Sequence, residues 1–530
     1  MNVPTTGSAR NFAADTGDSH TSSIAAWLER AVVGCLFAIA VCAPHSIAAT
    51  QGFWVSGLLL WAARFTVRPR PLLFRTPIDL PLLIFFSLTV LAAVFSYAPD
   101  ISISKLRSAS LFTIVFLVAQ NVSSPRVLRS LAVALIASCM INVVYTFGER
   151  ALGRGVRVEG LAAESPLRGA GVEEGDTLLE LDGAPLHNLA EVESALATGA
   201  SERPLPRIKV YRYEAFYDLD ITHGSLLSGA TPEARLGVGS WTRGRDWRAA
   251  GFYGHYTTYA EALQLIASLA LGLLIALHFG RGDSEQGVRS WRTRNSLLLG
   301  CAVAGLCAAL LMTVTRASWL AFLVSAFTIV LVGARSRRVA LVMVCAALLL
   351  VPLGLFVLQQ KRNVGFLDRR DASTTWRATV YREGVELLFK SPRHMLVGVG
   401  MDSIRRFWPQ WGMFEQGRIP RGHLHSTPLM IAVERGLPAL FVWFWFLFTY
   451  GRTLWRMTRE KLLDSWIERG IALGALGGLA GLFTSGIVHY NLGDSEVVMI
   501  FYFIVGLALV VNHQAVKEHP TREVVINPLP

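Results

Sequence analysis

The chain contains about twelve apolar runs, each close to the length that a helix needs to cross a bilayer. A membrane-spanning helix takes about 20 consecutive, mainly apolar residues. Hydrophobic residues make up 52% of the 530 residues and charged residues only 17%, which is little charge for a soluble protein of this length. The sequence therefore predicts a mainly α-helical, polytopic membrane protein. The predicted spans are 26–48, 50–66, 80–97, 104–121, 127–147, 256–279, 296–314, 317–334, 339–358, 427–450, 469–489 and 494–512.

Basic residues follow every even-numbered run, and they set the predicted orientation. Short cytoplasmic loops of membrane proteins carry an excess of Lys and Arg. The sequence therefore places these loops, and both chain ends, in the cytoplasm. The residues concerned are Arg68, Arg70, Arg75, Arg126, Arg129, Arg281, Arg289, Arg292, Arg294, Arg335, Arg337, Arg338, Arg452, Arg456, Arg459 and Lys461.

This orientation divides the chain into membrane helices and two long segments on the outer side. The polar residues 1–23 lack a compact signal-peptide pattern and are predicted to form a disordered cytoplasmic tail. The other predicted parts are 24–147 with membrane helices 1–5, an outer insert at 152–224, 246–358 with helices 6–9, a large outer loop at 359–426, 427–512 with helices 10–12, and a cytoplasmic tail at 513–530.

The large outer loop is unusually basic for its side of the membrane. Residues 359–426 hold twelve Lys and Arg against six Asp and Glu. Long loops can escape the positive-inside bias, so the topology stands. Guanidinium groups bind phosphate oxygens in bidentate geometry, which favours an anionic partner over a merely solvated loop. The rest of the net charge of +12 follows from topology and gives no indication of nucleic-acid binding.

The insert has the pattern of a small α+β domain. Residues 156–158 alternate like a strand, 187–196 have the pattern of a short helix, and 207–213 are predicted as the closing strand. With the run SPLRGAGVEEGD from Ser165 and LELDG from Leu179, the insert resembles a PDZ domain of the bacterial protease type.

That resemblance implies binding of peptide C-termini by strand addition, with a carboxylate-binding turn near 152–155. A structural or substrate-guiding insert is the alternative. Residues 214–245 receive no clear assignment from the sequence.

A membrane protein with such an insert also invites comparison with intramembrane zinc proteases. Those enzymes need an HExxH helix, which places two histidine ligands one turn apart, and none occurs here. The six cysteines all lie in apolar runs, so the sequence predicts neither a disulfide framework nor a cysteine-based zinc site.

Four groups of polar residues and glycines converge on the predicted outer face. An arginine at the bilayer centre is costly, about 2.5–3.5 kcal/mol on insertion scales, so arginines beside these spans are expected at the interface or in a protein-lined cavity. The groups are Arg248 to His255 before the sixth span, Thr315 to Trp319 between the seventh and eighth, Trp376-Arg377 with Gly398-Val399-Gly400, and His423-Leu424-His425-Ser426 with Gly436.

In this order the groups resemble the O-antigen ligase family and its relatives, the O-antigen polymerases and some protein O-oligosaccharyltransferases. The ligase signature is His, a small polar residue, nine residues, Gly, two residues, then Gly, Thr or Tyr. The chain fits until the last position, where it has Ala439. The resemblance implies a GT-C-like, inverting, metal-independent membrane glycosyltransferase without a cofactor. It also implies a role in lipopolysaccharide or polysaccharide biosynthesis at the bacterial inner membrane.

The resemblance also implies roles for individual residues. A glycan would pass from a polyprenyl-diphosphate donor to lipid A-core or another glycan acceptor on the periplasmic side. His425 is the predicted catalytic base, because an imidazole takes up a proton near neutral pH. The predicted diphosphate-binding residues are Arg248, Arg316 and Arg377, and the candidate substrate contacts are His255, His423 and Ser426.

Two alternatives to the ligase stay open at this point. A polysaccharide polymerase would use the same donor chemistry, so the sequence hardly separates the two. A non-catalytic transporter or an envelope sensor with a PDZ domain belongs to another class. A structural His425 is the corresponding alternative for the proposed base.

Overall fold

The computed structural model describes residues 15–197, 206–212, 215–221, 226–245, 247–279, 286–334, 372–459, 463 and 465–518. The protein is mainly helical, and the chain divides into two compact units. The first, here called the helical unit, comprises Met1–Met140, Ala260–Cys307 and Thr315–Pro530. The second, here called the sheet unit, comprises Ile141–Tyr259 and Ala308–Val314.

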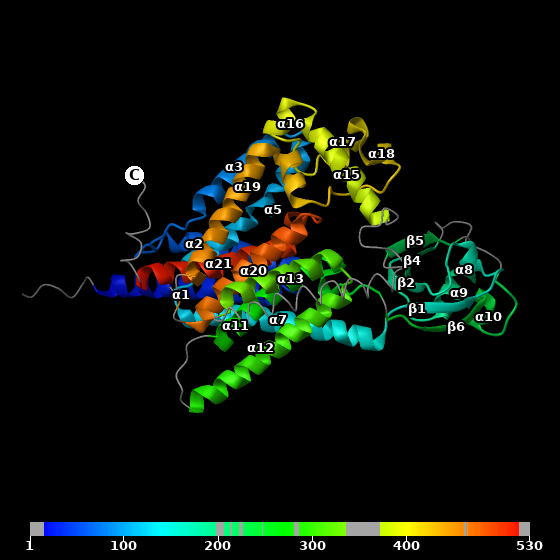
Figure 1. Cartoon of the computed structure of the whole chain (residues 1–530), viewed down its shortest axis with the longest axis horizontal. Helices are drawn as coiled ribbons and strands as arrows, with labels where there is room; N and C mark the ends of the chain where they lie inside the picture. The colour runs from blue at the N-terminus through cyan, green and yellow to red at the C-terminus, as the bar shows by residue number, and fades with distance from the viewer. Residues whose placement is uncertain are drawn as a thin grey trace, which may run out of the picture. The chain divides into compact units, whose positions relative to one another are not determined.

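The helical unit is built from long apolar helices joined by shorter ones (Figure 1). Three helices have residues in both units: α7 (Pro125–Leu152), α11 (Tyr256–Phe279) and α12 (Gln286–Met312). The others are α1 (Asp15–Cys42), α2 (Ile47–Arg64), α3 (Asp79–Val94), α4 (Pro99–Ser104), α5 (Leu106–Ala109), η1 (Ser110–Phe112), α6 (Thr113–Asn121), α13 (Arg316–Gly333), α15 (Ala372–Phe389), α16 (Pro392–Leu396), α17 (Ile404–Trp411), α18 (Met413–Gly417), α19 (Thr427–Arg459), α20 (Trp466–Gly486), η3 (Asn491–Gly493) and α21 (Ser495–Glu518).

Within the described residues, nine helical segments are long and apolar enough to cross a membrane. This number is consistent with the predicted polytopic membrane protein. The segments are Ser23–Cys42, Pro99–Asn121, Pro125–Leu152, Tyr256–Phe279, Arg292–Met312, Arg316–Gly333, Thr427–Arg459, Trp466–Gly486 and Ser495–Lys517.

Three of the twelve predicted spans are not among these nine segments. The run 50–66 falls on α2, which is helical but carries Thr50, Gln51 and Arg64. The run 80–97 falls on α3, an apolar helix of only 16 residues. The run 339–358 lies outside the described residues.

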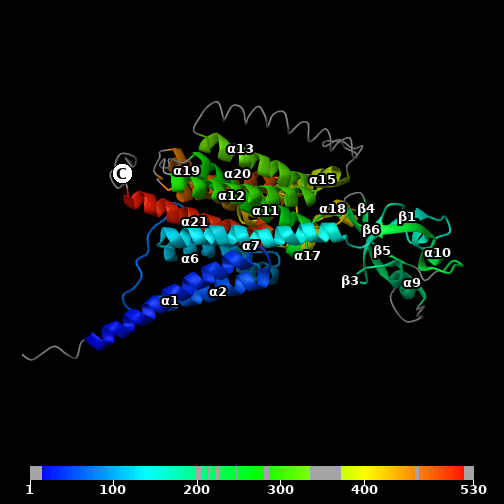
Figure 2. The ribbon, with the colours of Figure 1, turned by 90° about the horizontal axis from the view of Figure 1, so that it is seen from below.

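Glycines let three helices of the helical unit approach closely. A Cβ added at Gly481 of α20 would lie 2.8 Å from the Ala321 carbonyl oxygen of α13. One added at Gly474 would lie 2.6 Å from Cα of Leu269 on α11. Small residues give membrane helices this close backbone contact. Figures 1 and 2 show the same helices side by side, and α13 and α20 pack along much of their length.

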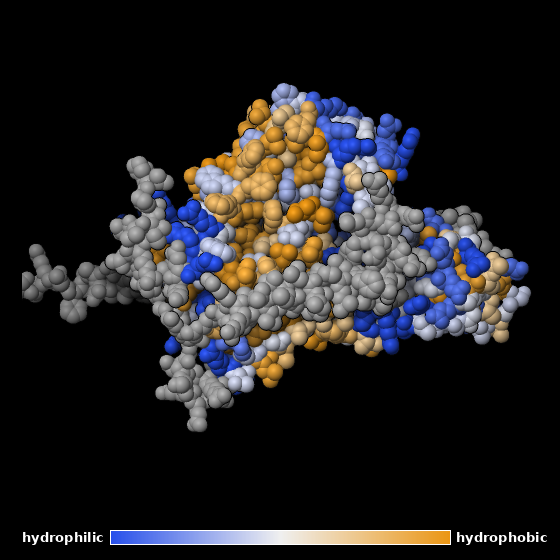
Figure 3. All heavy atoms as spheres, in the orientation of Figure 1, coloured by the Kyte–Doolittle hydropathy of each residue, from blue (hydrophilic) through white to orange (hydrophobic). Residues whose placement is uncertain are grey.

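The outer surface of the helical unit is apolar where α3 and α19 face outward. Figure 3 shows hydrophobic atoms gathered over these two helices and hydrophilic atoms over α17 and α18. The exposed side chains there include Leu80 and Leu83 on α3 and Phe441 and Phe448 on α19. An apolar surface of this kind suits contact with lipid.

The sheet unit contains one antiparallel sheet with the strand order β5-β4-β2-β1-β6, and β3 pairs with β2 at its side. Its hydrophobic core includes Val156, Leu178, Val192 and Val210. The elements are β1 (Val156–Leu161), α8 (Pro166–Gly169), β2 (Thr177–Leu181), β3 (Ala184–Pro185), α9 (Leu189–Ala197), β4 (Arg207–Arg212), β5 (Ala215–Asp220), α10 (Pro232–Leu236), β6 (Val238–Arg243) and η2 (Gly251–Tyr253).

The sheet extends beyond the predicted end of the insert at residue 224. The strand predicted at 207–213 is β4, but the prediction that it closes the sheet was wrong, because β5 and β6 follow it. β6 comes from the segment that received no assignment, and it pairs with β1 from Val156↔Arg243 to Leu161↔Val238. A strand that pairs with one more than 75 residues away leaves no local turn signal by which sequence could find it.

The turn at 152–155, predicted to hold a peptide carboxylate, is already engaged inside the sheet unit. The Arg154 amide donates to the Gly244 carbonyl at 2.9 Å. The Arg154 guanidinium forms an ion pair with Glu180 at 2.9 Å. These contacts link the turn to β2 and to the residue that follows β6.

Candidate functional site

Helix α19 follows His425 in the chain and is sharply broken at Gly436. Gly436 has φ 83° and ψ 166°, and a Cβ there would overlap the Leu396 carbonyl oxygen. Pro438 has no N–H with which to bond the Glu434 carbonyl of the preceding turn. The Gly400 amide donates to that carbonyl instead, at 2.9 Å. The structure thus brings together two of the predicted groups, the glycines at 398–400 and Gly436.

His425 lies just before α19 in a strained backbone conformation. Its φ is 48°, which is uncommon for a residue with a side chain. The Tyr381 hydroxyl donates to the His425 carbonyl at 2.8 Å and also contacts the Ile487 carbonyl at 3.2 Å. The Trp376 ring meets the His425 imidazole edge-on, with 5.0 Å between ring centres. Strained residues that their neighbours hold in place are frequent at functional sites.

Helix α15 therefore brings one predicted arginine to the His425 region. Arg377 follows Trp376 and lies one helical turn before Tyr381. Burial raises the pKa of the Tyr381 hydroxyl, and the positive charge of Arg377 offsets part of that rise. The hydroxyl consequently stays protonated and can donate to the His425 carbonyl. Two of the predicted site residues, His425 and Arg377, are thus neighbours of the same tyrosine.

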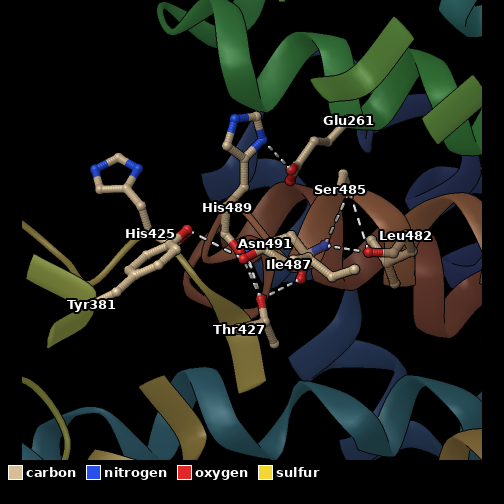
Figure 4. A network of polar contacts seen from close by, with 9 residues as sticks. All are labelled: Glu261, Tyr381, His425, Thr427, Leu482, Ser485, Ile487, His489 and Asn491. Carbon is tan, nitrogen blue, oxygen red and sulfur yellow. Dashed lines mark hydrogen bonds and ion pairs between the residues drawn. The ribbon is translucent and has the colours of Figure 1, made fainter. Parts of the chain in front are cut away.

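The loop between α20 and α21, residues 487–494, holds the first residue of α19 in place (Figure 4). The Thr427 amide and hydroxyl both donate to the His489 carbonyl at 3.0 Å. The same hydroxyl contacts the Asn491 side-chain oxygen at 2.8 Å, and the Asn491 amide group donates to the Leu482 carbonyl at 2.8 Å. This network ties the start of α19 to the end of α20.

The Thr427 hydroxyl carries much of this connection, so its removal should loosen it. Replacing Thr427 by valine keeps the shape but leaves buried partners without a hydrogen bond. We expect the free energy of unfolding to fall by about 1–3 kcal/mol, measured by thermal denaturation in detergent. Thr66→Val, at an exposed threonine, is the control and should change stability little. Equal stability of the two variants would contradict the role of Thr427.

A buried contact between a histidine and a carboxyl group lies beside this network, and sequence reasoning missed it. Nδ1 of His489 lies 3.0 Å from the Glu261 carboxylate, and both side chains are buried. Figure 4 shows the imidazoles of His425 and His489 projecting to the same side in that view. Glu261 stands in a membrane span, where an ionisable residue is a functional candidate by default. By this rule, the sequence could have marked Glu261 as a candidate.

Arg316 lies at the same end of the helical unit as the α20–α21 loop. Arg469, near the start of α20, donates to the Gly333 carbonyl at the end of α13 with 3.1 Å. Gly481, near the end of α20, lies against Ala321 in the first half of α13. The two helices are therefore antiparallel. Arg316, the first residue of α13, consequently lies at the end of α20 that leads into this loop.

Two other predicted residues belong to the sheet unit. Arg248 donates to the Val314 carbonyl at 3.1 Å, and its guanidinium carbon lies 4.3 Å from the centre of the Tyr256 ring. His255 is exposed, and its ring stacks on Tyr256 with 4.7 Å between ring centres. The contacts of Arg248 and His255 described here lie within the sheet unit, so their part in a common site with His425 stays a prediction.

His423 and Ser426, the remaining candidate contacts, point to different surroundings. The His423 ring lies 5.5 Å from the Tyr490 ring and lines a cavity together with Asp402. Ser426 is buried, and its carbonyl accepts the Met430 amide at 2.8 Å in the first turn of α19. Ser426 therefore immediately precedes α19, while His423 lines the cavity.

Comparison with known protein families finds a match over the part of the chain that contains His425. Residues 301–444 match the sequence model of the O-antigen ligase family, and no curated protein matches the chain. The matched residues include Arg316, Arg377, His425 and Gly436, whereas Glu261 and His489 lie outside them. The chain is thus a multi-pass membrane protein whose residues 301–444 are similar to the O-antigen ligase family, and that similarity indicates a glycan-transferring membrane enzyme.

Proposed function

We propose that the chain is an O-antigen ligase-like glycosyltransferase. It moves a glycan from a polyprenyl-diphosphate donor to an acceptor hydroxyl at the periplasmic face of the bacterial inner membrane. The observation that carries the proposal is the fixing of His425 by Tyr381, with Arg377 on the same helix, inside the segment that matches the ligase family. In this proposal both chain ends are cytoplasmic, and the sheet unit and residues 359–426 face the periplasm.

The proposed reaction is a single displacement at the anomeric carbon. The acceptor oxygen forms a bond to that carbon from the face opposite the leaving group, so the configuration inverts. The bond from the carbon to the diphosphate oxygen breaks, and its electron pair stays on the diphosphate. The acceptor proton passes to the His425 imidazole, which acts as the general base.

The leaving diphosphate needs positive charge at fixed positions more than it needs a strong acid. Arg316 and Arg377 provide it in this proposal, with Arg248 as the third residue. Because guanidinium groups stay charged and bind phosphate oxygens in pairs, they can do so without a metal ion. His255, His423 and Ser426 remain candidate substrate contacts.

Arg316→Ala should weaken donor use while the protein remains inserted and folded. Loss of charge-assisted hydrogen bonds to a diphosphate should lower kcat/KM for the donor by about 10- to 100-fold. Initial rates over a range of donor concentrations would measure this. Arg126→Ala, at an exposed arginine near the start of α7, is the matched control. Donor kinetics like those of the control would remove Arg316 from the diphosphate site.

Lipopolysaccharide from a deletion strain tests the proposed function in the cell. Loss of capped lipid A-core, with accumulation of lipid-linked polymer, is expected for a ligase. Caps of a single repeat would instead assign the polymerase reaction with the same donor. An unchanged gel profile would contradict both and direct the search to another glycan or to protein glycosylation.

We also propose that the sheet unit is a PDZ-like insert that binds a peptide or protein partner. Its strand β6 lies at the edge of the sheet, and an edge strand can pair with an added peptide strand. The turn at 152–155 is engaged with Gly244, so β6 is the better candidate for such pairing.

A further inference from the structure

A cavity of about 130 Å³ lies in the helical unit, between α3, α5, α19 and α21. Its lining has an apolar part and a polar part. Leu82, Phe85, Phe86, Phe112 and Val498 form an apolar wall. The polar lining includes Lys105, Asp402, Arg405, His423, Glu434 and Arg435. Most of these polar residues take no part in the reaction proposed above.

Arg435 is a buried cation that lines this cavity, and its side chain is poorly compensated. The residue is 6% exposed. Its Nη2 contacts the Met401 sulfur at 3.5 Å, a weak acceptor, and its guanidinium carbon lies 5.3 Å from the centre of the Phe85 ring. Its Nε is buried without a hydrogen-bond partner. Among the residues that the structure describes, none forms an ion pair with Arg435.

The neighbouring carboxylate of Glu434 interacts electrostatically with Arg435 but forms no close ion pair with it, because both of its oxygens accept other hydrogen bonds. One of its oxygens accepts the Asp402 amide at 2.7 Å, and the other accepts the Tyr490 hydroxyl at 3.3 Å. Burying a charge without a close partner costs several kcal/mol. An anion from outside the chain would supply the missing partner of Arg435.

The other charged residues of the cavity leave an excess of positive charge. Lys105 and Arg405 share one carboxylate, that of Asp402, at 2.8 and 3.4 Å. Burial by itself raises the pKa of Asp402, but the Lys105 ammonium outweighs this effect and holds that pKa below its usual value. Three cations thus face the two carboxylates of Asp402 and Glu434.

His423 adds no charge to this balance at neutral pH. Its side chain is exposed on one side, but packing of protein atoms against the ring lowers its pKa below the usual value. The charges of Arg405 and Lys105 act in the same direction, while Asp402 opposes them. The neutral ring can therefore contact a ligand in the cavity as a hydrogen-bonding group.

We propose that this cavity binds the phosphate or diphosphate group of an amphiphile, with Arg435 as its main anchor. The guanidinium and the excess positive charge match phosphate oxygens. The apolar wall matches the adjoining hydrocarbon. Arg316, Arg377 and His425 are absent from the described lining, so this is a second anionic site beside the proposed catalytic residues. Its test measures binding and does not depend on transfer activity.

The probe is geranylgeranyl diphosphate, added in detergent to the purified full chain. All proteins compared also carry Arg316→Ala, so that the proposed donor site contributes little to the binding. We expect it to raise the thermal unfolding midpoint in a saturable way, because a ligand that binds the folded state stabilises it. Geranylgeraniol and inorganic pyrophosphate separate the two halves of the ligand. If geranylgeraniol binds as tightly as the diphosphate, the anionic site is wrong. If pyrophosphate alone binds as tightly, the ligand is a free phosphate compound and the amphiphile is wrong.

Arg435→Met removes the charge and keeps most of the volume. We expect the dissociation constant for geranylgeranyl diphosphate to rise by about 10- to 100-fold, as for a lost charge-assisted hydrogen bond. The midpoint without ligand should stay equal or rise, because an uncompensated buried charge is removed. Arg435→Lys keeps the charge but loses the planar guanidinium fork. Its dissociation constant should lie between those of the unaltered protein and of Arg435→Met.

The matched control is Arg382→Met, at an exposed arginine of α15 that pairs with Glu386. It should bind the probe like the unaltered protein. Binding by Arg435→Met within threefold of this control would overturn the proposal. So would a ligand-free Arg435→Met protein that is clearly less stable than the control, because Arg435 would then be a structural residue.

Discussion

Replacing His425 by alanine should lower the rate of glycan transfer by about 10²- to 10⁴-fold, the usual contribution of a general base. The acceptor hydroxyl would then have no group to take its proton as the anomeric bond forms. Donor affinity should change little, because the proposed diphosphate residues remain in place. Transfer by purified protein, with kcat and KM determined separately, would measure the effect.

Other histidines of the chain serve as comparisons for this variant. His187→Ala, at an exposed residue of the sheet unit, should transfer glycan at the normal rate. His423→Ala and His255→Ala should lose less activity than His425→Ala, as expected of substrate contacts. Full activity in His425→Ala, or a larger loss in His423→Ala, would show that the base is assigned wrongly.

Gly436→Ala should prevent the helical unit from reaching its folded state in normal yield. Backbone angles like those of Gly436 are essentially restricted to glycine and cost other residues about 1–3 kcal/mol. The added Cβ would also overlap the Leu396 carbonyl oxygen, which is backbone and cannot turn away. We therefore expect a loss of about 3 kcal/mol or more, seen as a lower thermal midpoint and less monodisperse protein after detergent extraction.

Gly34→Ala is the matched control for this change. A Cβ at Gly34, in the middle of α1, would meet no atom within 4 Å. Alanine is also favoured over glycine inside a helix, by about 1 kcal/mol. This variant should be as stable as the unaltered protein or slightly more so. A Gly436→Ala protein that matched it in yield and midpoint would mean that α19 does not break at this residue.

Sequence alone predicted the features that depend on local pattern. Long apolar runs indicate membrane helices, because a segment in lipid must form its backbone hydrogen bonds internally. Gly436 and the glycines at 398–400 stood out as motifs, and the structure explains them by close backbone contact. α2 and α3 show the limit of this approach, since hydropathy does not report where a helix begins and ends among its neighbours.

The contacts that fix the site could not be derived in this way. Glu261 and His489 are separated by more than 220 residues, and their pairing depends on how α11 packs beside α20. The same holds for Tyr381 with His425 and for Arg435 with its cavity. A charged residue in an apolar run can be flagged from sequence as costly, but its partner is set by tertiary packing.

Glycan transfer can be followed with purified protein, a polyprenyl-diphosphate-linked glycan and lipid A-core, with mass spectrometry of the products and NMR spectroscopy of the new glycosidic bond. We expect the acceptor to gain the mass of the donor glycan, the polyprenyl diphosphate to be released, and the new bond to have inverted anomeric configuration. An acceptor of unchanged mass, or a donor lipid whose glycan has lengthened instead, would contradict the proposed ligase reaction.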